Sequence, residues 1–369
     1  REPSEVATRT YTRSSVRESV VQRIYEQVYA PHEYGVVLEP SKIDEAGFTF
    51  DYDMVDNAHV FREDDTWYMT YVGYNEDPLP EGGYGPDSGY STGLARSTDL
   101  LHWEKVGAVL KPGDETEWDA SNTAGYIARE HTWGEAPTVL RIGADEEYVM
   151  TYLGSAEGGY ENGTTHMGLA TTRSLFPEGA GPFDPPLLWT KSAENPVMSP
   201  DGAVEKSKIW KSQLHRIDNR FVVFYNAGIY DLPEERICIA YSDDLTAWTR
   251  EPSNPVIAET WDGESNAWGS VINGDPDVVK IGEYWVMFYF TDTPTEHGIV
   301  DSFAVSPDAV RWYPAHRILR TTEEPYNENN AHKPCVFSYN GVVYHFYTAV
   351  SGWPGPTTRV IAMARSISS

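Results

Sequence analysis

Basic residues are scarce in this sequence, and their scarcity excludes several classes of partner. The 369 residues include 28 Lys and Arg against 56 Asp and Glu, so the formal net charge is -28. A surface of this charge repels phosphate backbones and anionic membranes. We therefore expect neither nucleic acid nor a membrane as a partner, and the composition favours neutral or cationic ligands.

Cysteines and long apolar runs are also scarce. The two cysteines, Cys238 and Cys335, each lie in an apolar run, which predicts buried free thiols rather than a disulfide framework. No run of about 18 apolar residues is present, so we predict no transmembrane helix. Phosphate-binding glycine loops, zinc-ligand spacings and Ser-His-Asp elbows are missing too. The sequence begins at Arg1 rather than Met, and we expect a secreted or periplasmic protein, with the cytoplasm as the alternative.

Aromatic residues, in contrast, are abundant and partly periodic. A string of small-x-Ala-x-Ser followed by Ser-x-Asp-x-x-x-Trp occurs at 93–103, 238–248 and 302–312, with degenerate copies at 168–174 and 361–366. These five copies indicate five repeating units. The recurring Asp99, Asp244 and Asp308 are predicted to accept hydrogen bonds from turn amides.

Each unit reads as four short strands, and five such units are typical of a five-bladed β-propeller. We expect the first strands at 58–62, 136–142, 212–217, 276–281 and 333–339. The fifth unit ends after its third strand, but "YGVVLEP" at 34–40 is similar to the fourth strand "GAVLKP" at 107–112. We therefore predict an all-β propeller that this N-terminal strand closes.

A short helix is predicted ahead of the first strand. Val16, Val20, Ile24 and Val28 recur every four residues, and Ser15 with Glu18 forms a capping-box pattern. The predicted division is an N-terminal helical extension at 1–33 and a catalytic propeller domain at 34–369. The apolar stripe of the helix needs a cover, either its own domain or a second subunit in a homodimer.

The candidate site lies where the first strands begin, because these entrances converge on the channel of a propeller. Polar and aromatic residues gather there in combinations that a scaffold does not need. Three entrances carry carboxyl groups, on Asp56, Glu135 and Asp275, and paired carboxyl groups are what glycoside cleavage needs. The expected substrate-binding residues are Asn57, His59, Trp133, Trp210, Lys211, Asp277, His332 and Lys333. Structural alternatives stay open: Asp56 as a partner of turn amides, His332 as a structural histidine, and the lysines as salt-bridge partners of the carboxylates.

The whole ring, about residues 34–366, resembles the five-bladed glycosidases that include glycoside hydrolase families 43, 32, 62, 68, 117 and 130. The resemblance to family 43 implies that Asp56 in "VDNAHVFR" is the general base, with Asp51 and Asp53 as rivals. It likewise implies that Glu135 in "GEAPTVL" is the acid and Asp275 in "GDPDVVK" the carboxylate that sets its pKa. Their order along the chain departs from family 43, so these two roles could be exchanged. His332 in "NAHKP" is similar to a histidine near the site of family 117.

The resemblance implies a glycoside hydrolase that cleaves a terminal bond of a plant or algal oligosaccharide, of furanoside or anhydro-galactose type. Families 43 and 117 imply inversion of the anomeric centre, whereas family 32 implies retention. The alternatives are a phosphorylase or transglycosidase of the same fold, for which Arg129, Lys211, His332 and Lys333 could bind phosphate, and a non-catalytic sugar-binding propeller. No cofactor is required, although the carboxylates could hold a structural calcium or sodium ion.

Overall fold

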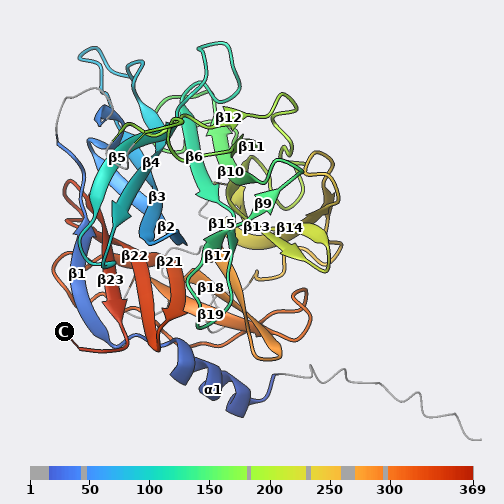
Figure 1. Cartoon of the computed structure of the whole chain (residues 1–369). Coiled ribbons are helices and arrows are strands. Elements are labelled where there is room, and N and C mark those ends of the chain that lie inside the picture. Colours follow the sequence, from blue (N-terminus) through green and yellow to red (C-terminus); the bar gives the residue numbers. More distant parts are fainter. Residues whose placement is uncertain are drawn as a thin grey trace, which may run out of the picture.

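The protein consists almost entirely of β-strands. The computed structural model describes residues 16–42, 48–180, 184–229, 234–258, 271–293 and 298–368. These residues form 23 strands, one α-helix and a short 3-10 helix, η1 (Thr49–Asp51). The chain is therefore all-β with one helix, as predicted at this level. Figure 1 shows the strands arranged around the middle of the molecule, with the helix at its edge.

Twenty of the 23 strands form five groups of four, which we call units 1 to 5, and the other three are additions to unit 2. Unit 1 contains β2 (Met54–Glu63), β3 (Thr66–Asn75), β4 (Gly89–Ser97) and β5 (Glu104–Leu110). Unit 2 contains β6 (Asn122–Ile127), β10 (Glu147–Ser155), β11 (His166–Thr172) and β12 (Thr190–Lys191), with β7 (Arg129–Glu130), β8 (Thr138–Val139) and β9 (Arg141–Ile142) as additions. Unit 3 contains β13 (Lys208–Ile217), β14 (Arg220–Ile229), β15 (Glu234–Ser242) and β16 (Thr249–Arg250). Unit 4 contains β17 (Val271–Ile281), β18 (Tyr284–Asp292), β19 (Ile299–Ser306) and β20 (Tyr313–Pro314). Unit 5 contains β21 (Asn330–Tyr339), β22 (Val342–Ser351), β23 (Thr358–Arg365) and β1 (His32–Leu38).

The fourth strand of unit 5 comes from the start of the described chain. Strand β1 pairs antiparallel with β23, from His32 opposite Arg365 to Leu38 opposite Ile361. The segment that resembled a fourth strand in the sequence thus lies beside the third strand of the last unit. This pairing covers an edge of β23 that would otherwise expose unpaired backbone groups.

Apolar layers lie between successive units and follow one another in a cycle. Phe61 and Met150 belong to the layer between units 1 and 2, and separate layers lie between units 2 and 3 and between units 3 and 4. A further layer joins units 4 and 5, and Val60 and Phe337 belong to the layer between units 5 and 1. The first strands also contact each other in the order β2, β6, β13, β17, β21 and back to β2.

One expected first strand is placed wrongly by the sequence pattern. In unit 2 the strand that pairs with β10 along most of its length is β6, with Ile127 opposite Met150 and Asn122 opposite Ser155. The predicted segment 136–142 supplies only the two-residue strands β8 and β9. The segment 131–137, which includes Trp133 and Glu135, bridges to Lys280 and Tyr339 at the far ends of β17 and β21.

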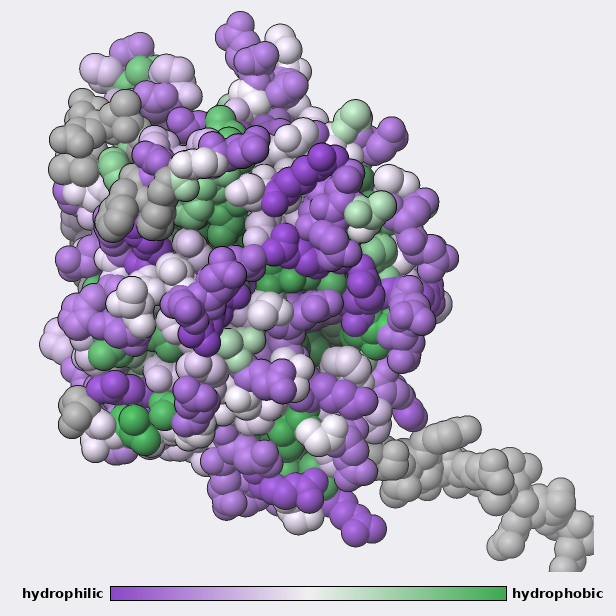
Figure 2. Space-filling view, in the orientation of Figure 1, coloured by the Kyte–Doolittle hydropathy of each residue, from purple (hydrophilic) through white to green (hydrophobic). Residues whose placement is uncertain are grey.

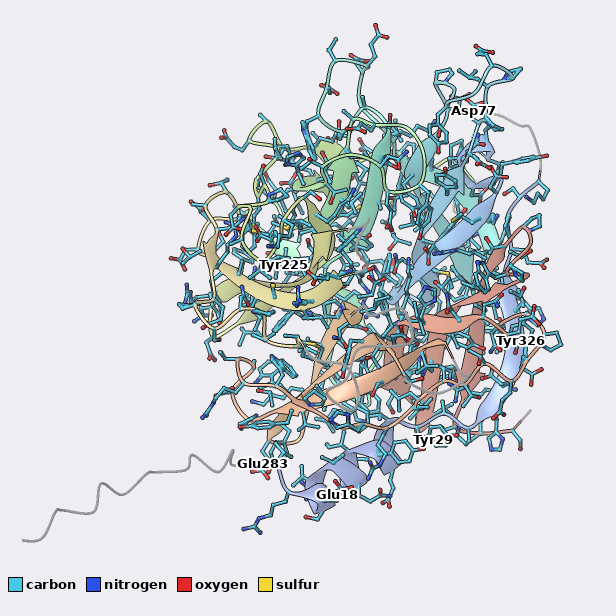
Figure 3. All side chains as sticks on the ribbon, turned by 180° about the vertical axis from the view of Figure 1, so that it is seen from behind. Glu18, Tyr29, Asp77, Tyr225, Glu283 and Tyr326 are labelled. Atoms are coloured by element: carbon cyan, nitrogen blue, oxygen red, sulfur yellow. The ribbon has the colours of Figure 1, made fainter. Side chains whose placement is uncertain are left out.

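Helix α1 (Glu18–Val28) packs on its own chain. Val21, Ile24 and Val28 are buried in the apolar layer between units 4 and 5, together with Phe303 of β19. Figure 3 shows the helix, between the labelled Glu18 and Tyr29, against the strands of these units. Arg17 occupies the N-cap position without a side-chain cap, so the helix starts later than the capping-box pattern predicted. Ser15 lies outside the described residues, and the homodimer stays a prediction.

The repeated turn and the cysteines agree with the sequence. In each full copy of the signature the aspartate Oδ1 accepts two backbone N–H groups, from Leu101 and His102 in the case of Asp99. Asp244 and Asp308 bind the equivalent amides. Both cysteines are free and buried, as predicted. Figure 2 shows that hydrophilic residues dominate the face it presents. No helix in the described residues is long and apolar enough to cross a membrane.

Candidate active site

A pocket of about 370 Å³ opens where the first strands begin. All five units contribute to its wall, which is why its residues are scattered along the sequence. The lining residues are Asn57, Tyr126, Tyr160, Glu161, Trp210, Lys211, Asn226, Glu235, Ile272, Asp275, Phe290, Ile299, Asn330, His332, Lys333 and Arg359.

A shared backbone irregularity directs side chains into this pocket. The register between first and second strands shifts after Asp56 in β2, Ile209 in β13, Gly274 in β17 and His332 in β21. The residues that follow are Asn57, Trp210, Asp275 and Lys333, and each lines the pocket. Three of them have positive φ angles: 53° at Asn57, 53° at Asp275 and 66° at Lys333. Bulges re-aim side chains in this way and are frequent beside active sites.

Three carboxyl groups line the pocket, and burial raises the pKa of each. The pKa of Glu235 is raised to about 8 by burial and then by the charges of Glu161 and Asp275. Its Oε2 accepts a hydrogen bond from Asn226 Nδ2 at 2.8 Å. Burial also raises the pKa values of Glu161 and Asp275, but Lys333 opposes the rise in both.

Asp56 lies directly behind the pocket wall. Its carboxylate is 1% exposed and accepts hydrogen bonds from Lys333 Nζ at 2.6 Å and Arg359 Nη1 at 3.1 Å. Burial alone would raise its pKa, but Lys333 and Arg359 outweigh that effect and hold the pKa below its usual value. These two cations therefore favour the ionised form of Asp56.

His332 lines the pocket as a neutral imidazole. Burial, with the charges of Lys333 and Arg359, lowers its pKa to about 3. Its Nδ1 lies 3.1 Å from the carbonyl oxygen of Thr348, which can only accept a hydrogen bond. We therefore assign the proton to Nδ1, which leaves Nε2 as an acceptor.

Several buried polar atoms that line the pocket have no hydrogen-bond partner within the described part of the chain. They include Asn57 Oδ1, Asp275 Oδ2, Asn226 Oδ1 and Trp210 Nε1. Native proteins satisfy nearly all such atoms with protein groups, water or ligand. A hydroxyl-rich ligand could satisfy both the acceptors and the donor.

The structure brings together some of the expected site residues and separates others. Asn57, Trp210, Lys211, Asp275, His332 and Lys333 line the pocket. His59 and Asp277 are buried but not among the lining residues, and Asp277 binds Arg129 instead of facing the pocket. Glu135 is exposed and Trp133 packs on the layer between units 4 and 5, at the other end of the first strands. The rivals of Asp56 lie elsewhere: Asp51 binds Lys105 and Tyr71, and Asp53 binds the Glu76 amide.

The sequence did not identify the other two pocket carboxylates, Glu161 and Glu235. Glu161 lies in the glycine- and tyrosine-rich loop 156–166, and Glu235 lies at the start of β15. Within the described residues, no group of three or more His, Cys, Asp or Glu side chains is placed to hold a metal ion. The calcium or sodium ion stays a prediction.

Solved structures similar to this chain decide its family. A structure of BT0996, described as a complex with RGII, is 33% identical, covers 95% of this chain and 96% of its own, and has a TM-score of 0.79. A structure described as "Glycoside hydrolase" gives the same values. The chain therefore belongs to the glycoside hydrolases. This confirms the resemblance at the level of a glycosidase enzyme.

A more distant glycoside hydrolase shares the fold. Zg3597, a family 117 glycoside hydrolase produced by the marine bacterium Zobellia galactanivorans, is 12% identical over 92% of this chain and 91% of its own, with a TM-score of 0.58. No family model matches the 369-residue chain described here. No curated protein matches it either.

Proposed function

We propose that this glycoside hydrolase cleaves a terminal glycosidic bond of an oligosaccharide, with Glu235 as general acid and Glu161 as its ionised partner. The observation that carries the proposal is that these two glutamates share one pocket in opposite electrostatic surroundings. Environments that drive the pKa values of two carboxyl groups apart assign one as acid and the other as base or nucleophile.

Glu235 has the surroundings of a proton donor. After burial, the largest effects on its pKa are the negative charges of Glu161 and Asp275. With a pKa of about 8, its carboxyl group keeps a proton at neutral pH and can donate it to a leaving glycosidic oxygen. Gly274 gives it room, because a Cβ there would lie 2.9 Å from Glu235 Oε2.

Glu161 has the surroundings of a carboxylate. The positive charges of Lys333 and Arg359 are the largest electrostatic effects on its pKa, and both lower it against the effect of burial. Burial leaves the pKa of Glu161 raised, but because these two cations favour its charged form we assign Glu161 as the ionised partner, which can attack the sugar or activate water. Asp275 adds negative charge beside both glutamates and accounts for part of the raised pKa of Glu235.

Cleavage of a terminal bond is consistent with the small volume of the pocket and with its closed inner end. Its volume of about 370 Å³ lies near the lower end of the range for small-molecule sites, about 300–1,000 Å³. We propose that the five units are the blades of a propeller, as their cyclic order of contacts and apolar layers supports. The Arg129–Asp277 pair lies between the first strands and would block the channel below the pocket. One sugar at the end of a glycan could enter such a site.

We propose an oligosaccharide derived from RGII as the substrate, since a relative with 33% identity was solved as a complex with RGII. A furanoside or anhydro-galactose residue remains the expected terminal sugar. Tyr126, Trp210 and Phe290 line the pocket and offer aromatic faces to the sugar ring. A secreted or periplasmic location suits such a substrate and stays a prediction.

The test is hydrolysis of nitrophenyl furanosides, nitrophenyl pyranosides and RGII oligosaccharides, with and without phosphate. We expect phosphate-independent release of one terminal sugar. Phosphate-dependent turnover would instead establish a phosphorylase, and binding without turnover would establish a sugar-binding propeller. Inversion, implied by families 43 and 117, is checked by proton NMR of the first product anomer.

Two isosteric variants test the assigned glutamates. Because a general acid or base contributes about 10²–10⁴-fold, Glu235→Gln and Glu161→Gln should each lower kcat/KM by at least 100-fold. Glu135→Gln is the matched control and should keep wild-type activity, since Glu135 is exposed and lies outside the pocket. Wild-type kcat/KM should fall as pH rises through about 8, where Glu235 loses its proton. Full activity in either glutamate variant would refute the assignment.

A further inference from the structure

We infer that Asp56 is a positioning residue that holds Lys333 and Arg359 against the pocket, rather than the general base that the sequence resemblance implied. The inference rests on the proposed role of Glu161. It assigns to Asp56 the task of keeping two cations where they act on that glutamate.

All four acceptor sites of the Asp56 carboxylate are in use. Oδ1 accepts the Asn57 backbone N–H at 3.0 Å and the Thr348 hydroxyl at 2.6 Å. Oδ2 accepts the ammonium group of Lys333 at 2.6 Å and the guanidinium group of Arg359 at 3.1 Å. An ionised carboxylate offers about four lone-pair sites, so none remains for the proton of an attacking water. A general base needs a free lone pair within reach of that water.

The location of Asp56 supports the same conclusion. Its side chain is 1% exposed, and it is not among the residues that line the pocket, whereas Lys333 and Arg359 both are. The carboxylate therefore reaches the pocket only through the two cations that it binds.

The partners of Asp56 show what it holds together. Lys333 belongs to β21, Thr348 to β22 and Arg359 to β23, which are three successive strands of unit 5. One side chain of unit 1 thus fixes three strands of unit 5 at the pocket. Asp56 also accepts a hydrogen bond from the backbone N–H of the bulged residue Asn57, which fixes the bulge of β2. We call Asp56 and these hydrogen bonds the clamp.

Lys333 and Arg359 are the groups through which Asp56 would act. Both of their positive charges lower the pKa of Glu161 against the effect of burial, and both effects are larger than the direct effect of the Asp56 charge, which raises it. Burial would also drive each cation toward its neutral form, but the negative charge of Asp56 helps to keep both charged, because it raises the pKa of each. Asp56 therefore holds Lys333 and Arg359 in place by hydrogen bonds and favours their charged forms, and these two charges favour the ionised form of Glu161.

The decisive experiment is a double-mutant cycle on kcat/KM with Asp56→Asn, Lys333→Met and the double variant. If Asp56 acts through Lys333, each single variant should lose about 10–100-fold, and the double variant should lose no more than about threefold beyond Lys333→Met. Losses that multiply would overturn the inference. Restoration of Asp56→Asn activity by added formate or azide would also overturn it, because a small anion replaces a missing base but not a clamp.

The pH dependence supplies a second readout that survives if Asp56→Asn fails to fold. Lys333→Met and Arg359→Met should each move the acidic limb of kcat/KM to higher pH, because each removes a charge that lowers the pKa of Glu161. An unmoved limb in both variants would refute the clamp. Failure of the proposed function is a separate outcome, since it appears as an active Glu161→Gln enzyme whatever the Asp56 variants do.

Discussion

The buried ion pair between Arg129 and Asp277 offers a sharp test of how the units are held together. Arg129 Nη2 lies 2.6 Å from Asp277 Oδ2, and the two side chains are 1% and 2% exposed. Arg129 Nη1 also donates to the Val60 carbonyl oxygen at 2.9 Å and to Cys335 Sγ at 3.3 Å. One side chain from unit 2 therefore bonds to units 1, 4 and 5.

Replacing Arg129 with Met should destabilise the protein substantially. Removing one partner of a buried pair costs about 3–5 kcal/mol, because the other charge stays buried without compensation. With an unfolding entropy of about 2.1 cal/mol/K per residue, a chain of 369 residues has about 0.8 kcal/mol/K. The expected fall in Tm is therefore about 4–6 °C, measured by calorimetry at pH 7.

The pH dependence of this loss has a definite sign. In the wild type Arg129 keeps the pKa of Asp277 below its usual value, although burial raises it. That contribution to stability is present above the unfolded pKa and is lost as pH falls through the folded pKa. In Arg129→Met, burial should raise the pKa of Asp277, so its protonation relieves the cost. The Tm difference between wild type and variant should therefore shrink as pH falls from 7.

Two further variants make the reasoning refutable. The double variant Arg129→Met with Asp277→Asn removes both charges and should recover most of the lost Tm, since replacing a whole buried pair is often nearly neutral. Arg173→Met breaks an exposed pair with Asp145 and should cost less than about 1 kcal/mol. A Tm within 1 °C of wild type for Arg129→Met, or a double variant no better than the single one, would show that the pair does not hold the strands together.

Two other substitutions test the helix and the room around the proposed acid. Ile24→Ala should lower the free energy of unfolding by about 2–5 kcal/mol in urea titrations, because Ile24 is 1% exposed in the layer between units 4 and 5, whereas Arg23→Ala should stay near wild type. Gly274→Ala should lower kcat/KM while the enzyme still folds, because its Cβ would lie 2.5 Å from Phe290 Cζ and 2.9 Å from Glu235 Oε2; unchanged kinetics would mean that these side chains can move aside.

The repeat was readable from the sequence because it is local. The turn around Asp99 needs only an aspartate followed by amides two and three residues later, and the same spacing returns at Asp244 and Asp308. The fourth strand at 34–40 was found by similarity to another copy. Features that depend on a few neighbouring residues leave a recognisable sequence pattern. The repeated turns and the strand at 34–40 could therefore be predicted.

The first strand of unit 2 was placed wrongly because its sequence has only a weak strand pattern. Strand β6 reads "NTAGYI", with a glycine and an asparagine that are both uncommon in strands, whereas "APTVLRI" is apolar and β-branched. The glycine is needed where it stands, since a Cβ on Gly125 would lie 2.3 Å from Met150 Sδ. It would also lie 2.7 Å from Thr92 Oγ1 of unit 1, so close packing requires a residue with poor strand propensity here. The misplaced first strand is the reason that Glu135 and Trp133 were expected at its entrance.

Glu161 and Glu235 were missed for a different reason. Nothing near them in the sequence distinguishes them from the other acidic residues of a chain with 56 Asp and Glu. Their chemistry comes from residues in other units: Arg359 and Lys333 for Glu161, and Asp275 for Glu235. A pKa set by burial and by distant charges cannot be read from local sequence, however rich the motif.

Four of the candidate residues that line the pocket share one backbone cause. In units 1, 3, 4 and 5 the same register shift presents the next side chain to the pocket. The bulge therefore repeats from unit to unit, but the side chain that follows it differs. It is an amide at Asn57, an indole at Trp210, a carboxylate at Asp275 and an ammonium group at Lys333. Non-repeating polar residues at a repeating bulge are thus a signal that sequence analysis can use. The signal locates a pocket, but it cannot assign roles within it, because Asp56 precedes the bulge and lies behind the wall.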